Sequence, residues 1–285
     1  MRQYFQCGRF GFDLAKRPLV MGILNVTPDS FSDGGRYQSL EFAVERAEQM
    51  IQDGVDIIDI GGESTRPGSP SVPVQEELAR VMPAIYALRE LGQPLSIDTC
   101  KPEVMREAII AGADMINDIN AFRAPGAIEA VRDGDCGLCV MHMQGTPQDM
   151  QAQPHYGDVV AEVIAFLRER VDALLAAGVA RERITIDPGF GFGKSVAHNV
   201  ALFRAMDRMQ RELGLPVLAG VSRKSMIGAL TGRSVEARLA GSLAGAMAAL
   251  AQGARIVRVH DVAETVDALE VWQALATNNQ WKAEN

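Results

Sequence analysis

No run of apolar residues in this 285-residue sequence approaches the roughly 18 residues that a membrane-spanning helix requires. The N-terminal segment MRQYFQCGRFGF also lacks the apolar core of a signal peptide. Hydrophobic residues make up 47% and charged residues 22% of the chain, a composition that excludes a largely disordered protein. We therefore expect a cytoplasmic protein with a full hydrophobic core and no membrane partner.

Positive charge is also scarce. The 28 Lys and Arg residues are outnumbered by 36 Asp and Glu residues, so the net charge is −8. This balance excludes a general nucleic-acid partner, which requires a basic surface. It does not exclude an anionic small molecule, because a few local Arg and Lys side chains can bind one.

Cysteine is rare, with four residues in the whole chain, so a disulfide scaffold is excluded. Cys136 and Cys139 form a CxxC pair, which can indicate a redox or metal site. No second such pair and no Cys/His pair at zinc spacing accompanies it. We favour the alternative, in which two small residues lead from a helix into the apolar run 138–141.

Short apolar runs alternate with longer amphipathic stretches. The expected strands are 19–24, 57–60, 95–97, 115–117, 138–142, 184–187, 217–220 and 256–259. The expected helices are 40–52, 74–91, 102–111, 124–133, 159–177, 200–213, 235–252 and 263–275. Strict alternation predicts a parallel sheet, and eight such units fit an α/β fold of the (β/α)₈ TIM-barrel type, typically about 250 residues long.

No linker or low-complexity tract divides the chain, so we expect one domain over 1–285. Its parts are an N-terminal β-hairpin in 1–16, the barrel in 17–277 and a tail in 278–285. The hairpin would plug the N-terminal end of the barrel. A doubly wound sheet is the alternative, but that fold usually has fewer strands and a cofactor fingerprint after the first one.

Polar side chains gather where each expected strand ends. They are Asn25, Glu63 to Arg66, Asp98, Thr99, Asn117, Asp118, His142, Asp187, Ser222 to Lys224, Arg258 and His260. In a barrel all of these positions surround the C-terminal mouth, where active sites lie. Each could instead cap a helix; Asp98, for example, could cap the helix that begins near 102. Capping does not explain why polar residues follow all eight strands.

The glycine-rich segment DPGFGFGKS at 187–195 imitates a phosphate-binding loop. Pro188 stands where the nucleoside-triphosphate pattern needs glycine, and position 196 lacks the third glycine of the dinucleotide pattern. The segment instead offers a carboxylate, bare backbone and the rings of Phe190 and Phe192, which suit a flat ligand that donates hydrogen bonds. A simple glycine-rich turn is the alternative.

Cationic residues follow the seventh expected strand and lie in and just past the eighth. Ser222, Arg223 and Lys224 are flanked by apolar residues, so at least one of the two charges should face the mouth. Arg258 and His260 share one face of a strand and could bind an anion. The alternative for Arg258 is a structural ion pair with Asp261 or a nearby Glu. Covalent catalysis by Cys100 is disfavoured because no histidine stands near it in sequence.

Taken together, the ordered motifs resemble those of the dihydropteroate synthase family. The resemblance runs over nearly the whole chain, from about 19 to 275. The motifs that carry it are NVTPDSFSDGG at 25–35, DIGGESTRPG at 59–68, IDTCKPEV at 97–104, INDI at 116–119, MHMQGTP at 141–147, DPGFGFGK at 187–194, SRKSMIG at 222–228 and RVHDV at 258–262. The family fold is the (β/α)₈ barrel.

The resemblance implies an enzyme of folate biosynthesis that joins 6-hydroxymethyl-7,8-dihydropterin diphosphate to p-aminobenzoate, giving 7,8-dihydropteroate and pyrophosphate. It implies Mg²⁺ as cofactor, a homodimer and sensitivity to sulfonamides. The pterin would be bound by Asp98, Asn117, Met141, Asp187, Phe192 and Lys224. The diphosphate would be held by Asn25, Arg66, Arg258 and His260, with Asn25 also on Mg²⁺. The p-aminobenzoate would meet Phe31, Thr65, Pro67 and Ser222. Asp98, Lys224, Arg258 and His260 would be catalytic.

The implied mechanism is dissociative: the bond from the pterin methylene to the diphosphate loosens first, and the arylamine then attacks. Loops 25–36 and 63–73 would close to exclude water. One rival is a pterin-binding methyltransferase module, which has no diphosphate to hold. A second is a non-catalytic pterin-binding paralogue, which would be expected to lack some of these residues.

Overall fold

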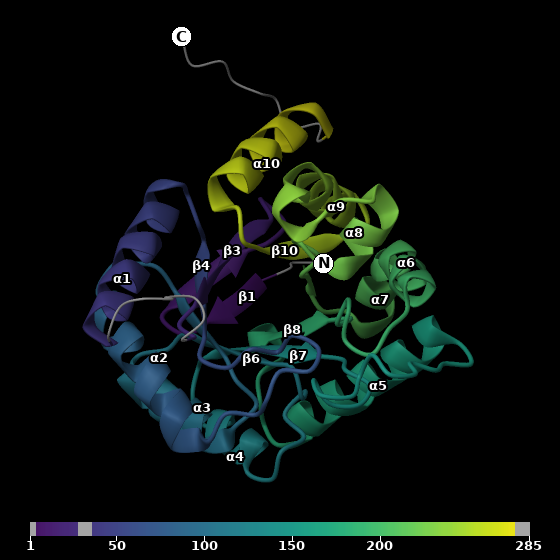
Figure 1. The fold of residues 1–285 in the computed structure, drawn as a ribbon. Coiled ribbons are helices and arrows are strands. Elements are labelled where there is room, and N and C mark those ends of the chain that lie inside the picture. Colours follow the sequence, from purple (N-terminus) through teal and green to yellow (C-terminus); the bar gives the residue numbers. More distant parts are fainter. Residues whose placement is uncertain (1–3, 28–35, 277–285) are drawn as a thin grey trace.

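Eight parallel strands form a closed barrel inside a ring of helices (Figure 1). This computed structural model describes residues 4–27 and 36–276. The barrel strands are β3 (Leu19–Asn25), β4 (Ile57–Gly61), β5 (Leu95–Asp98), β6 (Met115–Asp118), β7 (Gly137–Met141), β8 (Ile184–Asp187), β9 (Val217–Ala219) and β10 (Ala254–Val259). Strand β10 pairs with β3, with Ile256 opposite Leu19, and this pairing closes the sheet. The TIM barrel is confirmed, and the open doubly wound sheet is wrong.

Each expected helical stretch contains a helix. The helices are α1 (Arg36–Gln52), α2 (Val74–Leu88), α3 (Pro102–Ala111), α4 (Ala127–Val131), α5 (Val159–Ala176), α6 (Val196–Arg204), α7 (Met206–Leu213), α8 (Ser225–Thr231), α9 (Leu239–Ala251) and α10 (Val262–Ala276). Within the described ranges, none of them combines the length and the apolar character needed to cross a bilayer.

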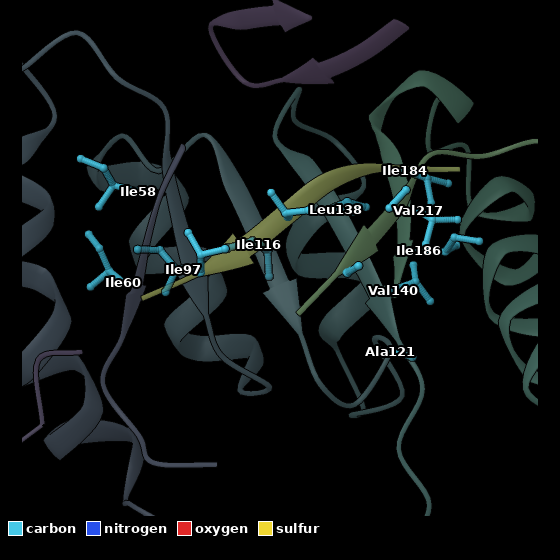
Figure 2. Packing of buried hydrophobic residues seen from close by; sticks show 14 of the residues in the cluster. Ile58, Ile60, Ile97, Ile116, Ala121, Leu138, Val140, Ile184, Ile186 and Val217 are labelled. Atoms are coloured by element: carbon cyan, nitrogen blue, oxygen red, sulfur yellow. The ribbon is translucent and has the colours of Figure 1, made fainter. Parts of the chain in front are cut away.

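Alternation along the strands separates two apolar layers. In β4, Ile58 and Ile60 face the helices and belong to the large outer core, which is drawn in Figure 2. Ile57 faces the barrel interior and belongs to a separate cluster. Because successive side chains of a strand point to opposite faces, Asp59 and Gly61 also lie on the inward side.

An N-terminal hairpin of β1 (Tyr4–Cys7) and β2 (Phe10–Asp13) covers one end of the barrel. Phe5 and Cys7 are fully buried against inward residues of the strands, including Met115 and Ile256. Figure 1 shows β1 over the centre of the ring of strands. The expected plug is therefore confirmed, and it leaves the opposite, C-terminal mouth for a site.

Some helix ends shift by a few residues, and the largest differences from expectation lie between 195 and 252. The stretch expected as one helix over 200–213 is two helices, broken at Ala205, and α6 begins earlier because Ser195 and His198 form a capping box. Helix α8 was not expected, and the stretch 235–252 begins with a 3₁₀ turn before α9. Histidine is not the usual partner in a capping box, so the start of α6 could not be identified from its pattern.

The cysteines of the CxxC pair lie in different parts of the core. Cys136 packs in the outer core, Cys139 packs in the interior cluster beneath the mouth, and both are free thiols. Burial raises the pKa of each thiol. Their surroundings fit the simpler interpretation, in which both are small core residues.

Candidate active site

A pocket opens at the C-terminal mouth of the barrel. It is lined by Asp98, Asn117, Ile119, Met141, Asp187, Phe192, Gly220, Lys224 and Arg258. All six residues expected at the pterin are among them, although they come from five different strand ends and loops. Arg258 joins them, and the sequence pattern did not single out Ile119 or Gly220.

Strand ends position the polar walls of this pocket. Asp98 and Asp187 are the last residues of β5 and β8, and Asn117 is the third residue of β6. The backbone N–H of Gly189 donates to Asp187 Oδ1 at 2.6 Å, which fixes that carboxylate. Asp98 does not cap α3: the cap position is Lys101, without a side-chain hydrogen bond.

Arg258 bridges two carboxylates inside the barrel. Its Nε donates to Asp59 Oδ2 at 2.6 Å, and its Nη2 donates to Asp98 Oδ2 at 2.8 Å. The expected alternative, a structural ion pair, is confirmed in kind but wrong in its partner: Arg258 pairs with Asp59 and Asp98, and Asp261 is bound by Arg223. Sequence reasoning missed Asp59, although a carboxylate among the isoleucines of β4 was a visible signal.

Several buried acceptors of the site have no protein partner among the described residues. They are Asp59 Oδ1, Asp98 Oδ1 and Asn117 Oδ1. A buried acceptor without a donor costs about 1–3 kcal/mol, so such atoms normally have a partner in the functional state. Asp98 and Asn117 line the pocket, which therefore favours a ligand with N–H donors along one edge.

Burial shifts the charges of the pocket toward neutrality. It raises the pKa of Asp98 to about 7, although the Arg258 guanidinium opposes the shift. It also raises the pKa of Asp187, opposed by Lys224, and it lowers the pKa of Lys224 to about 8. Desolvation acts against the charge of Arg258 too, but Asp59 and Asp98 outweigh it and raise the pKa of that guanidinium.

The glycine-rich segment after β8 forms one wall of the pocket and is held in place by side-chain contacts, so it is more than a turn. Lys194 is 3% exposed, and its Nζ contacts His142 Nδ1 and the carbonyl oxygens of Gly189 and Phe192, each at 2.9 Å. Lys224 Nζ donates to the carbonyl of Phe190 and lies 4.8 Å from the ring centre of Phe192. One of the two charges in the Ser222–Lys224 segment thus faces the mouth, as expected.

A second group of predicted residues lies around the rim. Ser222 Oγ is 3.0 Å from His260 Nδ1, so a residue expected at p-aminobenzoate contacts one expected at the diphosphate. Burial, with the charges of Arg258, Arg223 and Arg66, lowers the pKa of His260 to about 4. A neutral His260 would bind an anion as a hydrogen-bond donor and not as a cation.

Asn25 Oδ1 and Asp98 Cβ both lie close to Gly61, which has no side chain. A methyl group at Gly61 would come within 3.4 Å of Asn25 Oδ1 and 3.9 Å of Asp98 Cβ, so Gly61 keeps this space open. No cluster of three or more His, Cys, Asp or Glu suited to a metal occurs in 4–27 or 36–276. One amide oxygen fits Mg²⁺ held mainly by substrate phosphates and water, which is its usual mode.

The β4–α2 loop, which carries Thr65, Arg66 and Pro67, is anchored at its base and its tip. Glu63 Oε1 accepts from Val72 N at 3.1 Å, and Lys101 Nζ donates to Glu63 and to buried Glu77. At the tip, Gly68 N donates to the carbonyl of Pro147 in the β7–α5 loop at 2.9 Å. Phe31 and most of the expected loop 25–36 lie outside the described residues.

Cys100 does not have the surroundings of a nucleophile. Burial raises its pKa to about 12, with Asp118 adding to the shift, so the thiol stays protonated at neutral pH. The described residues therefore give no support to covalent catalysis at this position.

Comparison with known proteins agrees with the geometry. The family model of the pterin binding enzymes matches residues 21–260. The dihydropteroate synthase of Neisseria meningitidis serogroup C is 51% identical over 281 residues, covering 97% of this chain and 99% of the relative. The Burkholderia cenocepacia dihydropteroate synthase complexed with 7,8-dihydropteroate is 57% identical, with a TM-score of 0.88 over 96% of each chain. The Yersinia pestis dihydropteroate synthase in a sulfonamide drug complex is 46% identical, with a TM-score of 0.89 over 95% of this chain and 98% of that one.

Proposed function

Because this chain belongs to the pterin binding enzymes and, within them, to the dihydropteroate synthases, transferases of folate synthesis, we propose that it condenses 6-hydroxymethyl-7,8-dihydropterin diphosphate with p-aminobenzoate. The products are 7,8-dihydropteroate and pyrophosphate. One observation carries this proposal: the pocket presents buried, unpartnered acceptors on Asp98 and Asn117 beside the cation of Lys224.

The pterin ring fits the chemistry of the pocket. Its amino group and ring N–H groups donate hydrogen bonds, and Asp98, Asn117 and Asp187 present acceptors. Its carbonyl oxygen accepts, and Lys224 is the donor that faces it. Phe192 and Met141 supply apolar surface for the flat ring.

The diphosphate lies, in this proposal, across the rim between Asn25, Arg66, Arg258 and His260. Arg258 is the planar bidentate donor that phosphate oxygens prefer, and it can exchange a carboxylate of the free protein for phosphate. Asn25 would hold Mg²⁺, which neutralises negative charge on the leaving diphosphate when bound.

In the reaction, the bond between the pterin methylene carbon and the diphosphate oxygen breaks, and the diphosphate leaves with the electron pair. The dihydropterin ring delocalises the positive charge that remains, and ionised Asp98 stabilises it. The amino nitrogen of p-aminobenzoate then attacks the methylene carbon and loses a proton. No protein nucleophile takes part, in keeping with the protonated thiol of Cys100.

Thr65 and Pro67 of the β4–α2 loop would place p-aminobenzoate together with Ser222, and Phe31 is assigned to the same subsite. The sulfonamide complex of the Yersinia relative supports a sulfonamide-binding site here. We expect a sulfonamide to compete with p-aminobenzoate in steady-state kinetics. Inhibition that is not relieved by raising the p-aminobenzoate concentration would contradict this assignment.

The Asp149→Ala substitution is expected to raise the KM for p-aminobenzoate about threefold to tenfold. Thr146 N and Oγ1 donate to Asp149 Oδ1 at 2.7 and 2.8 Å, and this turn presents the Pro147 carbonyl to Gly68. The KM for the pterin diphosphate should stay within about twofold. Asp149→Asn keeps the acceptor and is the control; an equal rise in both variants would contradict the role of the turn.

A bell-shaped pH profile of kcat/KM for the pterin diphosphate is expected. Activity should rise with pH as Asp98, whose pKa is about 7, loses its proton and can stabilise positive charge. It should fall at higher pH as Lys224, whose pKa is about 8, loses its positive charge. In an Asp98→Asn variant the acidic limb should disappear, and its persistence would assign that limb to another group.

Pyrophosphate release tests the proposed function. It should require both substrates and Mg²⁺, and chelation of the metal should abolish it. A methyltransferase module would instead consume methyltetrahydrofolate, and a non-catalytic paralogue would bind the pterin without turnover. Failure to release pyrophosphate, with an active control enzyme in the same assay, would contradict the proposal.

We also propose a homodimer through the exposed apolar groove between α9 and α10. The groove is lined by Leu243, Met247, Glu264, Asp267, Ala268, Val271, Trp272 and Leu275. Val271 is 58% and Leu275 is 83% exposed, which is unusual for side chains of this size beside one another. Light scattering coupled to size-exclusion chromatography should give twice the chain mass.

A further inference from the structure

Asp59 lies inside the barrel between the N-terminal plug and the pocket. It is the third residue of β4, directly opposite Ile23 and Ser96 of the neighbouring strands, and it is fully buried. Ile57, the inward residue below it, belongs to the plugged interior cluster. Gly61, the inward position above it, has no side chain, so the carboxylate of Asp59 is the last inward group of β4 beneath the mouth.

One oxygen of Asp59 contacts two residues of the site at once. Asp59 Oδ2 accepts from Arg258 Nε at 2.6 Å and from Asn117 Nδ2 at 3.3 Å. The Asp59 carboxylate, paired with the Arg258 guanidinium, accepts on Oδ2, so Asn117 turns its Nδ2 toward Asp59. Its Oδ1 is then directed elsewhere, and that atom is one of the buried acceptors without a partner in the described chain.

We propose that Asp59 is a positioning residue that makes Asn117 an obligate acceptor in the pocket and holds the Arg258 guanidinium beside Asp98. With Asp59 in place, the pocket wall formed by Asn117 and Asp98 binds a ligand edge that carries N–H donors. A ligand edge that carries acceptors binds weakly there. The inference rests on the proposed function, because the pterin is the ligand whose edge has those donors.

The test uses two substitutions in the full-length protein and the Kd of 6-hydroxymethylpterin, a probe without diphosphate, measured by titration calorimetry. Asp59→Leu keeps the branched shape and removes both acceptors, so the amide of Asn117 is free to turn. Binding should weaken at least about tenfold, while the KM for p-aminobenzoate stays unchanged. Probe binding is measured without turnover, so the two proposals can fail separately. A wild-type protein that binds the probe but releases no pyrophosphate refutes the proposed function, and the Kd values of the Asp59 variants still decide the role of Asp59.

The effect of Asn117→Asp on the affinity for the probe distinguishes a positioning role of Asp59 from a merely structural one. In the wild-type background it places two carboxylates together and should weaken binding. In the Asp59→Leu background the new carboxylate offers an acceptor in either orientation and a counter-ion to Arg258, so it should strengthen binding. Where Asp59→Leu does not fold, the smaller Asp59→Ala, which also removes both acceptors, replaces it in the same comparison. Unchanged affinity in the Asp59 variant, or an Asn117→Asp effect of the same sign in both backgrounds, would overturn the proposal.

Discussion

The Lys224→Ala substitution is expected to lower kcat/KM for the pterin diphosphate about 100- to 1,000-fold, the usual effect of removing a preorganised charge from an active site. Lys224 lies in the pocket wall, donates to the Phe190 carbonyl and faces the ring of Phe192. Its loss removes the donor for the pterin carbonyl and the first of the three cations, with Lys194 and Arg258, that oppose the raised pKa of Asp187.

Lys224→Met is the matched variant, because it keeps most of the apolar stem and removes only the charge. It should lose nearly as much kcat/KM as Lys224→Ala. The neighbouring Arg223→Ala should have little effect, since Arg223 pairs with Asp261 outside the pocket. Steady-state kinetics with both substrates measure the three variants; unchanged turnover and KM in Lys224→Ala would remove this residue from the site.

The Arg258→Met substitution should lower the free energy of unfolding by about 3–5 kcal/mol, as expected when one member of a buried ion pair is removed. Asp59 and Asp98 would keep their burial and lose their shared cation. Arg223→Met, which breaks the partly exposed pair with Asp261, should cost no more than about 1 kcal/mol. Urea unfolding followed by circular dichroism compares the two variants.

The sign of the pH dependence gives a second check on Arg258→Met. The guanidinium lowers the pKa of Asp98, so its removal should raise that pKa further. A carboxyl group whose pKa is higher in the folded state than in the unfolded state makes the protein less stable as pH rises between the two values. The difference in the free energy of unfolding between the wild type and Arg258→Met should therefore grow as pH rises through about 7. A deficit that shrinks over this range would show that Asp98 is not held as described.

The strands and the pocket could be predicted from the sequence because both depend on local pattern. Each apolar run is short and each is followed by polar residues, and a barrel brings all eight strand ends to one mouth. Asp98, Asn117, Asp187 and Lys224 could thus be placed at one mouth although they are far apart in the chain, and the family resemblance then grouped them around one ligand.

Pairings between distant side chains could not be predicted in the same way. The chain places Arg258 three residues from Asp261, but its partners are Asp59 and Asp98, which barrel closure brings to it. Contacts between loops are equally hidden, as with Gly68 and the Pro147 carbonyl. The break at Ala205 has no proline or glycine to mark it, so one continuous helix was the natural prediction.

The central claim is that the pocket joins a pterin methylene to an arylamine with loss of diphosphate. Mass spectrometry of the product tests it most directly, in a reaction that contains the pterin diphosphate, p-aminobenzoate, Mg²⁺ and methyltetrahydrofolate. We predict 7,8-dihydropteroate and pyrophosphate in equal amounts, with methyltetrahydrofolate unchanged and the yield abolished in Lys224→Ala. Release of pyrophosphate without the coupled product, or demethylation of the folate, would contradict the account.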